Sequence, residues 1–317
     1  MILSPDELRT LVELRHRSPH ELLGMHALGD GSGVVVRAFH PEAAKLEVRT
    51  LNPAKGPSFE LQRIHQAGLF EGVANGVNGV YGYELAVTDG QGQTHSARDH
   101  YSFLPTLSEA DLFLFGKGDE RRIHEKLGAQ LRTIEGLAGT SFAVWAPNAR
   151  RVSVVGDFNQ WDGRRHAMRL LGASGVWEIF IPGIGEGAHY KYEIANRHGR
   201  VVLKTDPCGF FFEVPPKNAA IVWNNHKFKW TDAAWMAKRR RGDPLRSPLS
   251  IYELHIGSWR KKSKAESLGY RELAAPLIQY VKDLGFSHVQ LMPIAEHAFY
   301  PSWGYQVTGF FAPTSRY

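Results

Sequence analysis

The sequence predicts a mostly β multidomain fold, with two similar β-sandwich modules in tandem followed by a segment in which strands and a helix alternate. Three observations lead to this prediction. Short alternating apolar runs with Gly-rich breaks follow a helical N-terminus, four sequence blocks recur at a spacing near 107 residues, and after residue 249 the pattern changes to strand, helix and strand. A chain of 317 residues has room for two or three domains.

The N-terminal stretch is expected to be helical over roughly its first 25 residues. Ser4 can cap the helix, Pro5 suits its first turn, and apolar residues recur at helical spacing from Leu8 to Leu14. Alternating runs then predict the strands of the first module, which are Val34–Phe39, Lys45–Thr50, Gly68–Val73 and Tyr81–Thr88.

The same pattern then repeats further along the chain. VRAFHPEAAKLEV at Val36–Val48 aligns with FAVWAPNARRVSV at Phe142–Val154, so that Phe39 matches Trp145 and Pro41 matches Pro147. Four matching blocks in one order indicate a duplicated β-domain, and their spacing suits sandwiches of about 100 residues. The other three pairs are Leu69–Val73 with Val176–Phe180, Tyr81–Gly92 with Tyr190–Val201, and Asp99–Phe103 with Asp206–Phe210.

The segment after the second repeat predicts a βαβ unit. Leu249–Trp259 and Ser287–Glu296 have the composition of buried strands, and Ser267–Phe286 is an amphipathic helix that we expect to begin near Pro276. Two strands joined by a helix should pair in parallel. The expected domains are therefore a first β-module at 1–110, a connector at 111–136, a second β-module at 137–225, a linker at 226–248 and the βαβ segment at 249–317.

Several of these stretches resemble one enzyme family. The runs YELHIGSW, GYREL, VQLMPIAEH and SWGYQVTGFFAPTSRY, all after residue 251, resemble the start of the catalytic barrel of the 1,4-α-glucan (glycogen) branching enzymes, members of the α-amylase superfamily (glycoside hydrolase family 13). FAVWAPNARRVSVVGDFNQWDG at Phe142–Gly163 resembles their family-48 carbohydrate-binding module. The earlier repeat, with SPHELLGMH at Ser18–His26 before it, resembles the additional N-terminal β-domain of the longer bacterial enzymes.

The resemblance implies a fold and an activity. It implies two immunoglobulin-like sandwiches and then the first β/α units of a (β/α)8 TIM barrel, with SWGYQVTGFFAPTSRY as the loop after the second barrel strand. The family cleaves an α-1,4-glucan and transfers the chain to form α-1,6 branches of glycogen, without a metal or an organic cofactor. The family's nucleophilic Asp and acid/base Glu lie on later strands, so the chain is expected to be truncated before them and inactive as written.

The resemblance also names binding residues. Tyr305 matches the Tyr that packs on the sugar at the cleavage subsite, with Trp303 and Gln306 as weaker companions. An aromatic face against sugar C–H groups buries apolar area without a polar penalty.

In the second module, the candidates for carbohydrate binding are Phe158, Asn159, Trp161 and Trp177. Trp161 lies in the polar, turn-rich stretch DFNQWDG, which favours an exposed indole; packing between domains is the alternative use of this side chain. Trp145, on an alternating strand, is expected in the core.

No catalytic pair is expected within the chain. Retaining glycosyl transfer needs two carboxyl groups about 5–5.5 Å apart. Glu253 and Glu296 could lie near a barrel mouth, but a structural role, such as binding loop backbone or a histidine, is expected for both. His255, His288 and His297 lack metal-ligand spacing and are expected to be structural.

Two alternatives remain open. The chain could be a non-catalytic α-glucan-binding protein with a vestigial barrel start. It could also come from a debranching or trehalose-releasing hydrolase of the same superfamily, because those enzymes carry similar modules before similar barrels.

Composition limits the partners. The net charge of +6 comes from basic runs at Lys238–Arg241 and Arg260–Lys264 with no nucleic-acid motif beside them, so these are expected to be solvated charges. No stretch is apolar enough for a membrane span, no secretory signal is evident, and the single Cys208 suits a reducing cytoplasm. A cytoplasmic monomer that binds α-1,4-glucan, and neither nucleic acid nor membrane, is the expectation.

Overall fold

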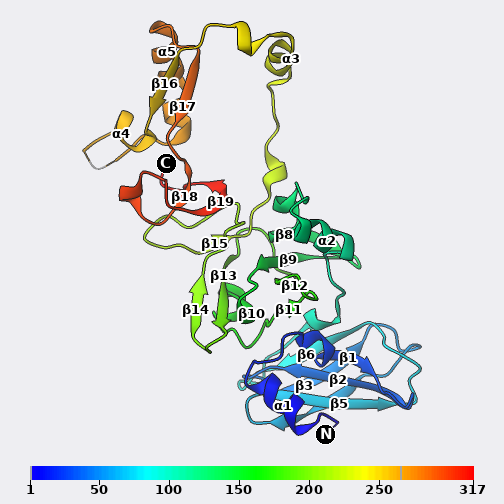
Figure 1. The fold of residues 1–317 in the computed structure, drawn as a ribbon. Coiled ribbons are helices and arrows are strands. Elements are labelled where there is room, and N and C mark those ends of the chain that lie inside the picture. The colour runs from blue at the N-terminus through cyan, green and yellow to red at the C-terminus, as the bar shows by residue number, and fades with distance from the viewer. Residues whose placement is uncertain (1, 265) are drawn as a thin grey trace. The chain divides into compact units, whose positions relative to one another are not determined.

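The computed structural model describes residues 2–264 and 266–317, and these are mostly β-sheet with few helices (Figure 1). The chain divides into two compact units, Met1–Asp206 and Pro207–Tyr317, which are described separately. Among the described residues, no helix is long and apolar enough to cross a membrane.

The N-terminal helix α1 (Pro5–Val12) is shorter than the sequence predicts. Ser4 Oγ accepts a hydrogen bond from the Glu7 amide (3.2 Å), and the Glu7 carboxylate accepts one from the Ser4 amide (2.8 Å), so both ends of a capping box are present. The helix stops because Leu14 adopts a left-handed conformation (φ 52°). The expectation of helix to about residue 25 is therefore wrong; the turn η1 (Pro19–Glu21) and strand β1 (Gly24–Ala27) occupy that stretch.

The first module is a seven-stranded antiparallel sheet. Four strands lie close to the predicted ranges: β2 (Gly33–Phe39), β3 (Lys45–Thr50), β5 (Leu69–Asn75) and β6 (Tyr83–Thr88). With β1, β4 (Phe59–His65) and β7 (Thr94–Arg98) they run in the order β1-β2-β5-β4-β3-β6-β7. Residues from both halves, including Val36, Leu46, Phe70 and Tyr83, share one buried cluster, so the sheet folds over a single core.

The second module has two sheets, as a sandwich requires. One sheet has the order β11-β12-β9-β8 and the other contains β10-β13-β14. The strands are β8 (Gly128–Ile134), β9 (Leu137–Trp145), β10 (Ala149–Gly156), β11 (Arg169–Leu170), β12 (Val176–Pro182), β13 (His189–Asn196) and β14 (Val201–Lys204).

The strand pairings repeat between the modules. β2 pairs with β5 as β9 pairs with β12, with Phe39 opposite Leu69 and Trp145 opposite Val176. β3 pairs with β6 as β10 pairs with β13, and β1 with β2 as β8 with β9. The duplication predicted from sequence is thus present in the topology. The modules differ at β4, which joins the two halves of the first sheet, whereas the short β11 pairs only with β12 among named strands.

The stretch expected to be a connector contains ordered structure. Helix α2 (Glu109–Lys117) begins at a second capping box, in which Ser108 Oγ accepts a hydrogen bond from the Asp111 amide (3.2 Å). β8 then forms a tight hairpin with β9 through Glu135 and Gly136, both at positive φ. The strands of the second module therefore begin before residue 137, at β8.

The modules contact each other through buried polar groups. Arg169 Nε donates to Glu178 Oε2 (2.9 Å), and both residues are almost completely buried. Arg169 Nη1 also donates to the Phe103 carbonyl (2.8 Å), while Glu178 Oε1 accepts from the Thr106 amide (3.2 Å) and hydroxyl (2.9 Å). A buried ion pair of the second module therefore holds the segment that leaves the first.

The second unit contains the predicted βαβ arrangement. β16 (Ile251–Leu254) pairs in parallel with β17 (His288–Leu291), and α5 (Tyr270–Asp283) connects them. α5 begins six residues before Pro276, so the expected start near that proline is wrong. β17 is exposed along its length rather than buried, because two strands and one helix cannot cover both faces of the sheet.

Further helices and strands of this unit flank the βαβ arrangement in the sequence. Helix α3 (Ala233–Arg241) occupies the expected linker, and its last turn carries the four basic residues of KRRR, where the negative end of the helix dipole favours them. The others include β15 (Ala220–Ile221), α4 (Ile256–Trp259), β18 (Ala295–His297), η7 (Tyr300–Ser302) and β19 (Val307–Pro313).

Candidate functional site

The stretch DFNQWDG forms a tight loop after β10 that is held together by Asn159. The Asn159 side chain accepts a hydrogen bond from the Gly156 amide (2.9 Å), donates to the Val154 carbonyl (3.0 Å) and donates to His166 Nδ1 (2.8 Å). It is completely buried. Asn159 therefore fixes the loop from its buried side, and its prediction as a sugar-contacting residue is wrong in this structure.

Trp161 is presented at the surface of this loop. Gln160 and Trp161 both have left-handed backbones (φ 58° and 62°), a conformation that costs a bulky residue energy and persists only where the surroundings enforce it. The indole N–H donates to Asp157 Oδ1 (3.1 Å), and Asp157 Oδ2 lies 3.0 Å from His189 Nδ1. With 37% of its surface exposed, Trp161 offers an oriented aromatic face to a ligand.

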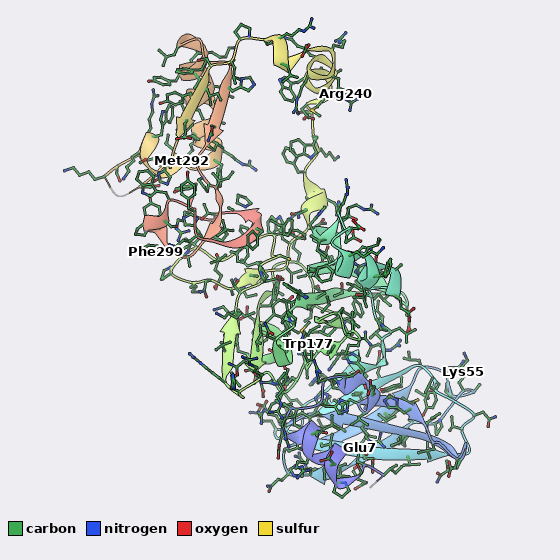
Figure 2. All side chains as sticks on the ribbon, in the orientation of Figure 1. Glu7, Lys55, Trp177, Arg240, Met292 and Phe299 are labelled. Atoms are coloured by element: carbon green, nitrogen blue, oxygen red, sulfur yellow. The ribbon has the colours of Figure 1, made fainter. Side chains whose placement is uncertain are left out.

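The other aromatic candidates of this module are placed differently. Trp177 is buried in the second module (Figure 2), where its indole N–H donates to the Ala146 carbonyl (3.1 Å), so it is a core residue and not a surface one. Phe158 is half-buried against Phe142 and His166. Trp145, expected in the core, is 54% exposed and contacts Phe115 of α2 edge-on.

A second aromatic surface lies in the C-terminal unit. Trp303 adopts a left-handed conformation (φ 56°) and stacks on His255, with ring centroids 5.6 Å apart. Tyr305, two residues later, is 66% exposed and Gln306 is exposed beside it. Gly304 between them is required, because a Cβ there would lie 2.2 Å from the Pro293 carbonyl oxygen.

The loop is fixed by short-range hydrogen bonds, so its aromatic side chains have defined places. The Tyr305 amide donates to the Ser302 carbonyl (3.1 Å). Partial burial, with a smaller effect of His297, lowers the pKa of His255, so this ring is neutral near pH 7. The Trp303–His255 stack is therefore a neutral aromatic surface of the kind that packs on sugar rings.

Glu296 is held by its neighbours. Its carboxylate accepts hydrogen bonds from the His297 and Ser315 amides, both 2.9 Å, and from Arg316 Nη1 at 3.1 Å. The hydroxyls of Thr314 and Ser315 donate to it as well. This is the backbone-binding structural role that the sequence predicts, and a carboxylate with so many donors is a poor nucleophile. Glu253 is exposed on β16.

Three histidines of this unit lie beside polar groups of the chain. His297 is buried with Nδ1 2.9 Å from the Ala295 carbonyl, His255 Nδ1 lies 3.0 Å from Ser258 Oγ, and His288 is exposed beside Ser287. Within the described ranges, no group of His, Cys, Asp and Glu side chains has an arrangement that could hold a metal ion.

Two protein families match parts of the chain. Residues 4–101 match the alpha-1,4-glucan branching enzyme GlgB N-terminal domain, and residues 126–209 match carbohydrate-binding module 48, described as the isoamylase N-terminal domain. The second match covers the DFNQWDG loop and Trp161. It begins two residues before β8, in keeping with a second module that starts at this strand.

Curated relatives match almost the whole chain. The 1,4-alpha-glucan branching enzymes GlgB of Myxococcus xanthus and Methylococcus capsulatus are each 47% identical to it, over 98% and 99% of its length. That of Rubrobacter xylanophilus is 49% identical over 98%. The chain spans 42% of the length of each. Over nearly its whole length, the chain is therefore similar to the N-terminal portion of these 1,4-alpha-glucan branching enzymes.

Proposed function

We propose that this chain is the glucan-binding N-terminal part of a glycogen branching enzyme, which cleaves an α-1,4-glucan and transfers the chain to form α-1,6 branches. The observation that carries this proposal is the identity of 47–49% to branching enzymes over 98–99% of the chain. We further propose that the βαβ unit is the start of a catalytic TIM barrel, that the domain boundaries are close to those expected from sequence, and that the protein is a cytoplasmic monomer.

Trp161 is the proposed contact of the second module with glucan. Its indole is exposed, its edge is held by Asp157, and the loop beneath it is fixed by Asn159, so little conformational entropy is lost when a glucose ring stacks on it. Tyr305 and Trp303, with Gln306 beside them, are proposed to contact the chain at the cleavage subsite.

Residues 1–317 are proposed to bind glucan without performing the transfer. Glu296 is engaged by structural hydrogen bonds, which leaves no obvious partner for Glu253 in a nucleophile and acid pair. The nucleophile and the general acid would then lie outside these residues. A hydrolase that removes branches or releases trehalose is the less favoured reading, because the named relatives are branching enzymes.

Affinity electrophoresis of the 317-residue chain in gels that contain glycogen tests the binding half of this proposal. Retardation that increases with glycogen concentration is expected, and a mobility independent of glycogen would contradict it. A chain that binds and also forms α-1,6 linkages would show that catalytic groups lie within it.

A further inference from the structure

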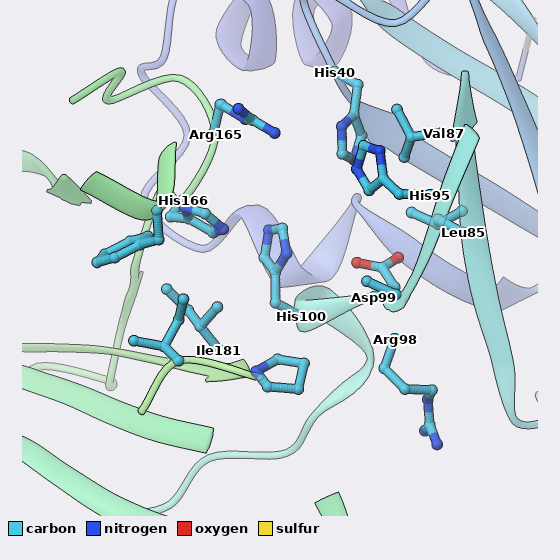
Figure 3. A pocket seen from close by; sticks show the side chains of 14 residues that line it. His40, Leu85, Val87, His95, Arg98, Asp99, His100, Arg165, His166 and Ile181 are labelled. Atoms are coloured by element: carbon cyan, nitrogen blue, oxygen red, sulfur yellow. The ribbon is translucent and has the colours of Figure 1, made fainter. Parts of the chain in front are cut away.

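A cavity of about 170 Å³ lies where the two β-modules of the first unit meet, and both basic and apolar side chains line it (Figure 3). His40 follows β2, and His100 lies in the turn η2 (His100–Ser102) of the first module. Arg165 and His166 lie in the segment between the DFNQWDG loop and β11 of the second module. In Figure 3, His40 lies on one side of the open space, His166 and Arg165 lie on the other, and His100 reaches in between them.

These groups have more hydrogen-bond donors than acceptors. His166 Nδ1 accepts from Asn159, whose orientation is fixed by its other two hydrogen bonds, so His166 must carry its proton on Nε2. His100 Nε2 is buried with no hydrogen-bond partner among the described residues. Its ring lies 4.6 Å from that of His166, centroid to centroid. Arg165 forms neither an ion pair nor a side-chain hydrogen bond within the described part of the chain.

The nearby carboxylates do not supply the missing acceptors. Asp99, which lines the cavity, accepts from the Tyr83 hydroxyl (2.5 Å) with one oxygen and from the Tyr101 amide (2.9 Å) with the other. Asp162 is bound by Arg164 through Nε (2.9 Å) and Nη2 (2.6 Å). The other titratable groups on the wall are His95 of β7 and Arg98, whose Nη2 donates to Glu135 Oε2 (2.9 Å). The cavity therefore presents the positive charges of Arg165 and Arg98 together with imidazole N–H groups, while the Asp162 charge acts on His166 in the opposite sense.

The histidines are neutral when the cavity is empty of an anion. Burial, followed by the positive charge of Arg165, lowers the pKa of His40 to about 4 and that of His166 to about 3. Burial, followed by His166, holds the pKa of His100 well below its usual value. A bound anion would offset the positive charges that help to lower these pKa values, although the effect of burial would remain. Anion binding would therefore favour protonation of the histidines.

We propose that this cavity is a binding site for a phosphate group. Arg165 and the N–H groups of His100 and His166 would hold the phosphate, and His40 would contact it from the other side of the cavity. A phosphate offers several strong acceptors to a set of converging donors, and an Arg side chain matches its geometry. The site would join the two modules through a shared ligand, since its donors come from both. This proposal does not depend on the proposed glucan activity.

The test is the ³¹P line width of inorganic phosphate in the presence of the 317-residue chain at pH 6.5, with chloride holding the ionic strength constant. We expect the phosphate line to broaden saturably at millimolar phosphate. The affinity for phosphate should be at least tenfold weaker in Arg165→Gln and partly restored in Arg165→Lys. Arg150→Gln, which removes an equal charge from an exposed position of β10, is the matched control and should broaden the line like the parent chain.

A second readout separates binding from a structural role of Arg165. The imidazole C–H resonances of His100 and His166 should titrate at higher pH with phosphate than with chloride. Absence of broadening, or equal broadening in Arg165→Gln and the parent, would overturn the proposal. A hexose phosphate that displaces inorganic phosphate would show that a sugar-borne phosphate reaches the site, and failure to displace it would restrict the site to the free anion.

Discussion

Tyr83 donates a 2.5 Å hydrogen bond to Asp99 inside the first module, and the duplicated module repeats this relationship. There, Tyr190 and Tyr192 donate to Asp206 at 2.6 and 3.2 Å. All these side chains are buried. Burial raises the pKa of Asp99, and the Tyr83 and Tyr101 hydrogen bonds counteract part of that rise. A buried Tyr–Asp bond at the same place in both modules extends the duplication from topology to the polar core.

Replacing Tyr83 by Phe is expected to destabilise the first module. The substitution keeps the ring but leaves one oxygen of Asp99 buried without its donor, which costs about 1–3 kcal/mol. Urea unfolding followed by fluorescence measures the loss. Glu109→Gln, at an exposed position of α2, is the control and should change stability little; equal stability of Tyr83→Phe and the parent would contradict the role assigned to this bond.

Replacing Arg169 by Met is expected to lower stability by about 3–5 kcal/mol, because it leaves the completely buried Glu178 without its counter-ion. The double variant Arg169→Met/Glu178→Leu should recover part of that loss, since no uncompensated charge remains. Limited proteolysis reports on the adjoining segment, because Phe103 loses a hydrogen bond in Arg169→Met and Thr106 also loses its bonds in the double variant. Additive effects of the two substitutions would contradict a coupled pair.

Replacing Trp161 by Ala is expected to weaken glycogen binding about tenfold, which corresponds to about 1.4 kcal/mol. The loop should keep its fold, because Asn159 rather than the indole holds it together. Trp230→Ala, which removes a highly exposed Trp from the second unit, is the matched control and should bind like the parent. Unchanged retardation of Trp161→Ala in glycogen gels would remove this residue from the binding surface.

The stability of the first unit is expected to fall as the pH drops below about 6.5. His40, His100 and His166 have a folded-state pKa below the unfolded value, so the unfolded chain binds protons that the folded chain rejects. Their contribution to the free energy of unfolding is complete above pH 6.5. It is lost progressively as the pH falls toward the folded-state pKa values, which are about 4 for His40 and about 3 for His166. Each adds a slope of up to about 1.4 kcal/mol per pH unit.

Urea unfolding between pH 7 and pH 5 checks this dependence. His40→Gln should flatten the slope, whereas His226→Gln, at an exposed position of the second unit, should not. Asp99 acts in the opposite sense, because its raised pKa favours the folded state at low pH, so the slope is best measured above pH 5. A slope that is the same in His40→Gln and the parent would contradict the lowered pKa of His40.

Helices and strands were predicted from the sequence more accurately than the exposure of individual side chains. The matching sequence blocks identified the duplication, because both modules retain the Tyr–Asp pairs, the turn prolines and the strand patterns. Alternation could not separate Trp145 from Trp177, because the two Trp residues lie on adjacent pairs at one end of β9 and β12 and most residues of both strands are buried on either face. Trp145 is exposed because it ends its strand, and Trp177 is buried because it lies opposite Val144 within the sheet.

The interface between the modules could not be predicted from sequence. His40, His100 and His166 are far apart along the chain and show no ligand spacing, and only packing of the two modules brings them together. Asn159 is a residue type that can bind sugars, but a short polar side chain after a strand can equally form the hydrogen bonds that fix its own loop. The family resemblance named Tyr305 and Trp303, whereas the stack of Trp303 on His255 depends on a loop conformation that spacing does not encode.

The most direct test of the central claim is ¹H NMR of a linear α-1,4-glucan incubated with the purified, mass-verified 317-residue chain. We expect the glucan resonances to broaden through binding, while no α-1,6 anomeric signal develops over time. Growth of α-1,6 signals would contradict the claim that residues 1–317 bind without transfer, and would direct attention to Glu253 and Glu296. Resonances unaffected by the protein would contradict glucan binding itself.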